Sequence, residues 1–120
     1  MSWLASLPHQ IPFRAASTGR RIDDRTIEGD YLCAAEDPRL FVAEAMAQLA
    51  GGLVFDPAQH GFLSGIDGFE LGAVMPGDVV RIVVRLDASL GDLFRFTATG
   101  AVDGVEVARG RFYLAAHENA

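Results

Sequence analysis

The 120-residue sequence contains no lysine, a single cysteine and no long uninterrupted hydrophobic run. Cys33 alone cannot form an intrachain disulfide, and no charged segment followed by an apolar stretch opens the chain, so we expect a protein of the reducing cytoplasm. All ten basic residues are arginine and the net charge is −6, without a basic cluster. This balance argues against nucleic acid as a partner. The main apolar segment is interrupted by Glu44 and Gln48, which argues against a membrane span.

Several chemical signatures are also missing from the sequence. It has no spacing typical of metal ligands, no glycine-rich phosphate loop and no nucleophile elbow. We therefore expect neither a metal nor another cofactor. Half of the residues are hydrophobic, and 120 residues suit one globular unit. The sequence predicts a single domain over residues 1–120.

The segment from Asp37 to Val54 has the features of a buried helix. Asp37 is a favoured N-cap residue and Pro38 suits the first helical position, so we expect a helix over about 38–54. Nearly all of its other side chains are apolar or small. A helix that is apolar on every side is normally buried rather than half solvated.

Glu44 is the one carboxylate in the middle of this helix. An ionised carboxylate in apolar surroundings costs several kcal/mol unless it has partners, or its pKa rises. Glu44 is therefore either paired with a buried amide or an arginine of a second subunit, or it belongs to a functional site. Both readings stay open at this point.

The rest of the chain reads as β-structure. We expect two short strands within residues 13–33 and further strands at 61–72, 79–88, 93–102 and 105–115. Asp103-Gly104 predicts a two-residue hairpin, and Pro76-Gly77 fits the centre of a type II turn. One long helix followed by antiparallel strands is typical of an α+β fold, in which a sheet of about six strands curls around the helix.

Three segments resemble the (3R)-hydroxyacyl-acyl-carrier-protein dehydratases, which have a hot-dog fold. Residues 44–48 (EAMAQ) resemble the E-A-x-A-Q segment of that family, and residues 7–13 (LPHQIPF) resemble its L-P-H-R-x-P-F opening. Residues 65–69 (GIDGF) and 75–78 (MPGD) resemble its G-I-D…P-G-D segment. The matches occur in family order and span most of the chain.

This resemblance implies a fold, a substrate class and an assembly. The fold would be a hot-dog, an antiparallel sheet wrapped around one long helix, and two subunits would pair with the active site at their interface. The substrate would be an acyl group linked to acyl-carrier protein or CoA, in fatty-acid- or polyene-type synthesis. Glu44 would be catalytic, and the substrate-binding residues would be Phe41, Gln48, Gly65 and Ile66.

The sequence departs from the family at the catalytic histidine. The family carries it in a loop of the form G-H-F-P-x-x-P-x-x-P-G ahead of the helix glutamate, and that loop is missing here. Counting fourteen residues back from Glu44 reaches Asp30, which could take the place of the histidine or be an ordinary solvent-facing residue. Glu36 and Asp37 are alternative acidic candidates near the helix start.

The three histidines of the chain are poor replacements. His9 lies between prolines and suits a loop hydrogen bond, His60 falls in a turn-like stretch, and His117 falls in a C-terminal segment expected to fray. An imidazole titrates near neutrality, whereas a carboxylate does comparable acid–base work only if burial raises its pKa.

Three functional hypotheses follow, and whether the chain is an enzyme stays open among them. The chain could be a working dehydratase that uses Glu44 and Asp30. It could instead be a degenerate subunit that binds acyl groups, or pairs with a histidine-bearing partner, as short members of the superfamily do. The third hypothesis is an acyl thioesterase in which the helix carboxylate activates water. The expected assembly is a homodimer, or a heterodimer with a related dehydratase.

Overall fold

The computed structural model describes residues 19–34, 39–55 and 60–117. Two short strands come first, β1 (Arg20–Asp23) and β2 (Thr26–Leu32), followed by the helix α2 (Arg39–Val54). Four long strands complete the chain: β3 (His60–Leu71), β4 (Val79–Leu90), β5 (Leu93–Val102) and β6 (Val105–His117). The predicted order of elements is confirmed, and the predicted boundaries of the helix and of the four long strands differ from the observed ones by at most two residues.

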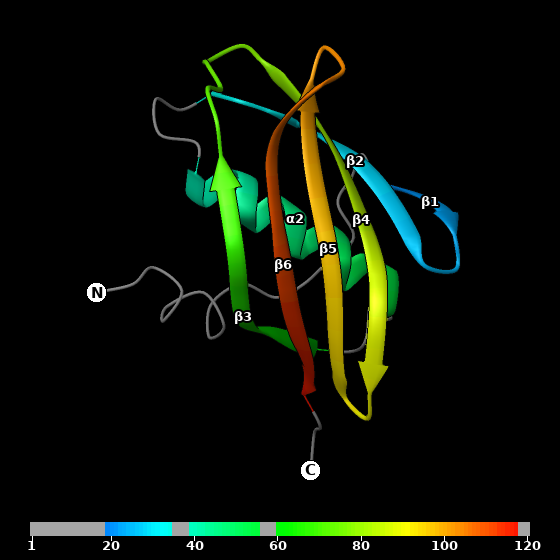
Figure 1. Ribbon diagram of the computed structural model, residues 1–120. Coiled ribbons are helices and arrows are strands. Elements are labelled where there is room, and N and C mark those ends of the chain that lie inside the picture. The colour runs from blue at the N-terminus through cyan, green and yellow to red at the C-terminus, as the bar shows by residue number, and fades with distance from the viewer. Residues whose placement is uncertain (1–18, 35–38, 56–59, 118–120) are drawn as a thin grey trace.

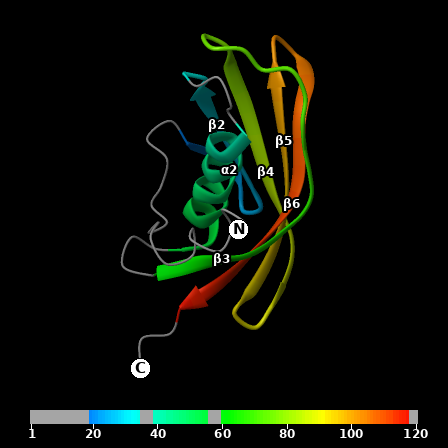
Figure 2. The same ribbon diagram turned by 90° about the vertical axis from the view of Figure 1, so that its left-hand side faces the viewer.

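The strands form one antiparallel sheet in the order β1-β2-β4-β5-β6-β3. In Figure 1 the helix crosses one face of this sheet, and the view in Figure 2 shows the sheet curving around it. The α+β arrangement expected of a hot-dog fold is therefore confirmed. β3 closes one edge of the sheet and the shorter β1 closes the other.

The core lies between the helix and the concave face of the sheet. Alternate residues of each strand turn toward the helix, as the period of a strand requires. Phe96 and Phe112 are fully buried there, and burial of side chains of this size stabilises the fold by about 1.5–3 kcal/mol each. The other buried strand residues are Ile27, Leu63, Val80, Ile82, Val84, Ala98, Ala108 and Leu114.

Both predicted turns are present. Asp103 and Gly104 have φ values of 50° and 81°, the left-handed pair that a two-residue hairpin of type I′ needs. At the other turn, the amide of Asp78 donates to the carbonyl of Met75 at 3.0 Å, and Gly77 has a φ of 96°. That geometry is the one expected for glycine at the third position of a type II turn.

Two predictions about histidines were wrong. His60 begins β3 and His117 ends β6, and the two are register partners in the sheet rather than residues of a turn and a frayed end. Strand pairing extends to both because residues 60–63 continue the ladder with 114–117. The resemblance at residues 7–13, His9, and the Glu36, Asp37 and Pro38 positions lie outside the described residues.

Candidate functional site

One stripe of α2 is less covered than the rest of the helix. Phe41 is 45% exposed, and Glu44, Ala45 and Gln48 are partly buried, whereas the helix residues between them are buried. These residues are spaced three to four positions apart, at 41, 44, 45 and 48, so they share one side of the helix. The helix is therefore not buried on every side in the single subunit, which corrects the expectation from its sequence. The residues buried around the stripe are Val42, Ala43, Met46, Ala47, Leu49 and Ala50.

Glu44 occupies the middle of this stripe. Within the described residues, no ion pair or hydrogen bond joins its carboxylate to another side chain. The arginine that reaches the helix, Arg21, donates instead to the carbonyl of Leu53 at 2.9 Å, near the helix C-terminus. The carboxylate thus sits on the accessible side of an otherwise buried helix. Pairing with an arginine of a second subunit remains a prediction.

Tyr31 on β2 is the polar side chain that the sequence reasoning missed. It is partly buried and packs against the core on the helix side of the sheet. Burial, and then the neighbouring Cys33 and the Glu44 carboxylate, raise the pKa of its phenol. The sequence contained the signal, because Ile27, Tyr31 and Cys33 alternate along the strand and so belong to one face.

Asp30, the predicted substitute for the family histidine, lies on the other face of the sheet. Its Oδ1 accepts a hydrogen bond of 2.7 Å from Nε of Arg81, across from it on β4. Glu28, two residues earlier, pairs with Arg20 on the same outer face. The structure therefore does not bring Asp30 and Glu44 together within one subunit, because adjacent residues of a strand point to opposite faces.

The two predicted binding residues of β3 are also split between the faces. Ile66 is opposite the buried Phe112 of β6 and packs against the core. Gly65 is opposite Tyr113, and a β-carbon at Gly65 would lie 3.7 Å from Cδ1 of that ring. The helix stripe thus contains three of the predicted site residues, Phe41, Glu44 and Gln48. Ile66 lies on the helix side of the sheet. Gly65 and Asp30 face outward.

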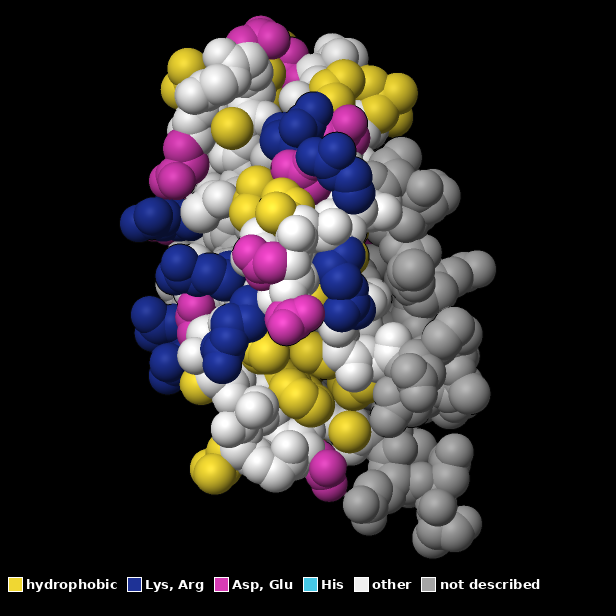
Figure 3. Space-filling view, turned by 90° about the vertical axis from the view of Figure 1, so that its right-hand side faces the viewer, with side chains coloured by type: hydrophobic (Ala, Val, Ile, Leu, Met, Phe, Trp, Pro, Cys, Tyr) yellow, Lys and Arg dark blue, Asp and Glu magenta, His cyan; other side chains and the backbone are white. Residues whose placement is uncertain are grey.

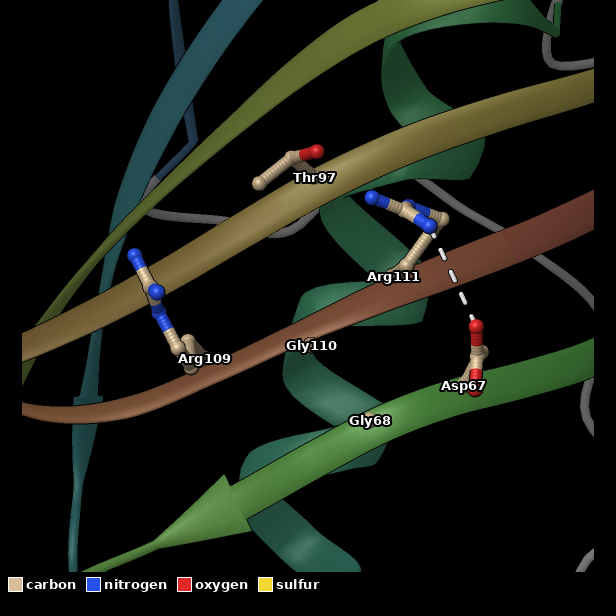
Figure 4. Close-up of a pocket in the computed structure, with 6 residues that line it drawn as sticks. All are labelled: Asp67, Gly68, Thr97, Arg109, Gly110 and Arg111. Carbon is tan, nitrogen blue, oxygen red and sulfur yellow. Dashed lines mark ion pairs between the residues drawn. The ribbon is translucent and has the colours of Figure 1, made fainter.

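The outer face of the sheet carries a second, shallow concavity. Figure 4 shows Arg109 and Arg111 projecting from β6, with Thr97 on β5 and Asp67 on β3 beside them and α2 behind the sheet. This hollow has a volume of about 260 Å³, and Nη1 of Arg111 lies 3.9 Å from Oδ2 of Asp67. Figure 3, which views the molecule from the side of β1, β2 and β4, likewise shows arginines interspersed with carboxylates. The outer face is a mixed-charge surface, separate from the Glu44 stripe.

The described part of the chain contains no group of three or more histidine, cysteine or acidic residues arranged to hold a metal ion. In the same part of the chain, no helix is long and apolar enough to cross a membrane.

Comparison with known sequences identifies the family. The 3-hydroxyacyl-[acyl-carrier-protein] dehydratase FabZ of Gluconacetobacter diazotrophicus is 38% identical, over 93% of this chain and 83% of that protein. FabZ of Roseiflexus castenholzii is 28% identical over 95% of this chain and 93% of that protein. This chain belongs to the FabZ dehydratase family. No protein-family model matches it.

Solved structures place the FabZ-like chain in the hot-dog fold. The dehydratase heterocomplex ApeI:P from Xenorhabdus doucetiae aligns with a TM-score of 0.74 and 18% identity, over 94% of this chain and 89% of that one. The fluoroacetyl-CoA-specific thioesterase FlK aligns with a TM-score of 0.65 and 14% identity, over 87% and 90%. Dehydratases and thioesterases thus share this architecture. FabZ membership favours the first class for this chain, an acyl-thioester-handling protein that resembles the dehydratases.

Proposed function

We propose that this protein binds acyl thioesters along the Glu44 stripe of α2 and takes part in the dehydration of 3-hydroxyacyl groups. The observation that carries the proposal is the position of Glu44. It is a carboxylate on the accessible side of a helix that is otherwise packed into an apolar core. Its exposed neighbour Phe41 offers apolar surface for an acyl chain. The FabZ relatives are 3-hydroxyacyl-[acyl-carrier-protein] dehydratases, which suggests the substrate class, an acyl group on acyl-carrier protein.

Among the described residues, the Glu44 stripe carries no histidine and no second carboxylate. Elimination of water from a 3-hydroxyacyl thioester needs a base for the α-proton and an acid for the departing hydroxyl. Asp30 faces the other side of the sheet and is engaged with Arg81. We infer that a partner subunit supplies the missing group, as a histidine of a complete dehydratase.

The free edge of β3 is where we propose that such a partner joins. β3 is 12 residues long and ends the sheet, so within the described subunit its outer edge has no strand beside it. An open edge of this length favours pairing with another strand. Either a second copy or a related dehydratase would continue the sheet there, and the heterocomplex ApeI:P is a precedent of the same fold. The proposed setting of this assembly is the cytoplasm.

The proposal can be tested by a hydration assay, the reverse of dehydration, on crotonyl-acyl-carrier protein. We expect the chain alone to be slower than a histidine-bearing FabZ by a factor of about 100 to 10,000, the usual cost of losing an acid–base group. Addition of a catalytically weakened but histidine-bearing partner should raise the rate, and Glu44→Gln should abolish the increase. Glu106→Gln, which removes an exposed carboxylate on the inner strand β6, away from the proposed partner edge, is the matched control and should change nothing.

Other outcomes would assign a different function. Full hydration rates from the isolated chain would make it a complete dehydratase. Release of free carrier thiol in place of hydration would assign it to the thioesterases. Failure of the unmodified chain to bind an acyl thioester, alone or with a partner, would contradict the proposal.

A further inference from the structure

Tyr31 shares the helix side of β2 with residues that are buried against α2. Ile27 and Cys33 are buried, and Gly29 lies directly against Leu49 of the helix. Tyr31 continues the same alternation and is partly buried. Its side chain therefore belongs to the space between the sheet and the helix, which Asp30 does not reach.

Two contacts fix the level of β2 along the helix. Arg21, the register partner of Ile27, binds the carbonyl of Leu53, and Gly29 contacts Leu49. Two residues along a strand advance about 6.6 Å, and four residues along a helix advance about 6 Å. Gly29 lies level with Leu49 of the helix. Tyr31, two residues further along β2, therefore lies level with residue 45 of the helix, next to Glu44.

The electrostatics of the pair agree with this placement. The Glu44 carboxylate is one of the groups that raise the pKa of the Tyr31 phenol, after burial and Cys33. A phenol with a raised pKa keeps its proton throughout the neutral range and remains a hydrogen-bond donor. Burial is the first cause of this rise, so the hydroxyl lies at least partly out of solvent, on the side of the sheet that faces the helix.

We propose that Tyr31 donates a hydrogen bond to the carbonyl oxygen of an acyl thioester held beside Glu44. This inference rests on the proposed function and assigns the polar group that would fix the orientation of the thioester there. When a base removes the α-proton, negative charge develops on that carbonyl oxygen, and a donor already in position stabilises it. A neutral phenol suits this role beside a carboxylate because it adds no charge to a partly buried site.

The test compares Tyr31→Phe with Tyr113→Phe, the same change at the only other tyrosine, which faces outward from β6. The probe is crotonyl-pantetheine, whose ultraviolet absorption band shifts to longer wavelength when its carbonyl is polarised. We expect the shift on binding to the unmodified protein and to Tyr113→Phe, and its loss in Tyr31→Phe. Loss of one neutral hydrogen bond should weaken binding about three- to tenfold.

A second measurement leaves the site unmutated. The chain has two tyrosines, so 3-fluorotyrosine labelling gives two fluorine resonances, which Tyr113→Phe assigns. Crotonyl-pantetheine should move the Tyr31 resonance and leave that of Tyr113 in place.

The outcomes separate this inference from the function on which it rests. One result would overturn the role of Tyr31 and leave the proposed function standing: binding depends on Glu44, the ligand does not move the Tyr31 resonance of the unmodified protein, and Tyr31→Phe keeps the absorption shift. Absence of binding to the unmodified protein, with or without a partner subunit, would overturn both.

Discussion

Gly29 of β2 lies so close to Leu49 of α2 that a β-carbon at Gly29 would be 2.9 Å from Cδ2 of the leucine. The leucine is only 2% exposed, so its neighbours leave it little room to move. This contact brings the strand onto the helix two residues before Tyr31.

Gly29→Ala should therefore destabilise the protein. Overpacking of a filled core by one methyl group forces shifts that cost about 1–3 kcal/mol. The measurement is the free energy of unfolding in urea. Gly65→Ala is the control, because its β-carbon would make only an ordinary contact of 3.7 Å with Tyr113. It should be neutral or stabilise by about 0.4–1 kcal/mol, and equal losses in both variants would contradict the close-contact argument.

Glu44→Gln should keep or raise the stability of the fold while abolishing acyl-thioester binding or turnover. The amide removes a charge from a partly buried position without changing the side-chain shape. Thermal unfolding and calorimetric titration with an acyl-pantetheine measure the two effects. If Glu44 belonged to a buried structural ion pair, the variant would instead lose about 3–5 kcal/mol, and such a loss would favour the structural reading.

Asp30→Asn should leave acyl binding and activity unchanged. The ion pair with Arg81 is exposed, at 44% for the Asp30 side chain and 59% for Arg81, so its loss should cost no more than about 1 kcal/mol. Kinetics with and without a partner subunit, together with urea unfolding, provide the check. Dehydratase activity of the isolated chain that disappears in Asp30→Asn would show that this aspartate acts in place of the histidine.

In solution the protein should be a dimer, because the outer edge of β3 is open in the described subunit and long enough to pair. Isologous pairing of two β3 strands joins two sheets into one. Light scattering at micromolar concentration should give about twice the 12.9 kDa mass of one chain. A measured mass of one chain would refute edge pairing between copies, and a mixture with a histidine-bearing relative would then test the heterodimer.

Stability should decline at alkaline pH through Tyr31. The folded state raises the pKa of this phenol above its ordinary value of 10.0, so the folded protein holds the proton more tightly than the unfolded chain does. The contribution of this pKa shift to the free energy of unfolding is complete below pH 10.0 and is lost as the pH rises through the raised pKa. Urea unfolding across this range should show the decline in the unmodified protein and in Tyr113→Phe, and a weaker decline in Tyr31→Phe.

The elements with strong local signals were predictable from the sequence. Asp103-Gly104 marks a hairpin because few other pairs adopt two left-handed conformations, and Val79 to Leu86 marks a strand because its two faces differ in polarity. The helix was recognisable by its apolar composition. The exposed stripe through Phe41 was not, because an almost uniformly apolar helix does not reveal which side the sheet leaves open.

The candidate site was only half predictable for a similar reason. Glu44 stood out as one carboxylate in an apolar segment. Its neighbour on β2 was sought by counting residues, which led to Asp30, whereas the pleat of the strand turns Asp30 outward and Tyr31 inward. The number of residues between two positions does not show to which face of the sheet a side chain points. A shift of one residue along a strand moves the side chain to the opposite face.

Two contacts that hold β1 and β2 against α2, those of Arg21 and Gly29, lie toward the C-terminal end of the helix, at Leu53 and Leu49. The connection between Leu32 and Arg39 joins the opposite end of the helix, so we expect its length to have little effect on how strand and helix meet. A loop could therefore be shortened there, or a longer one grafted in, while Tyr31 and Glu44 kept their places. This separation makes the junction a suitable position at which to restore a histidine-bearing loop by engineering.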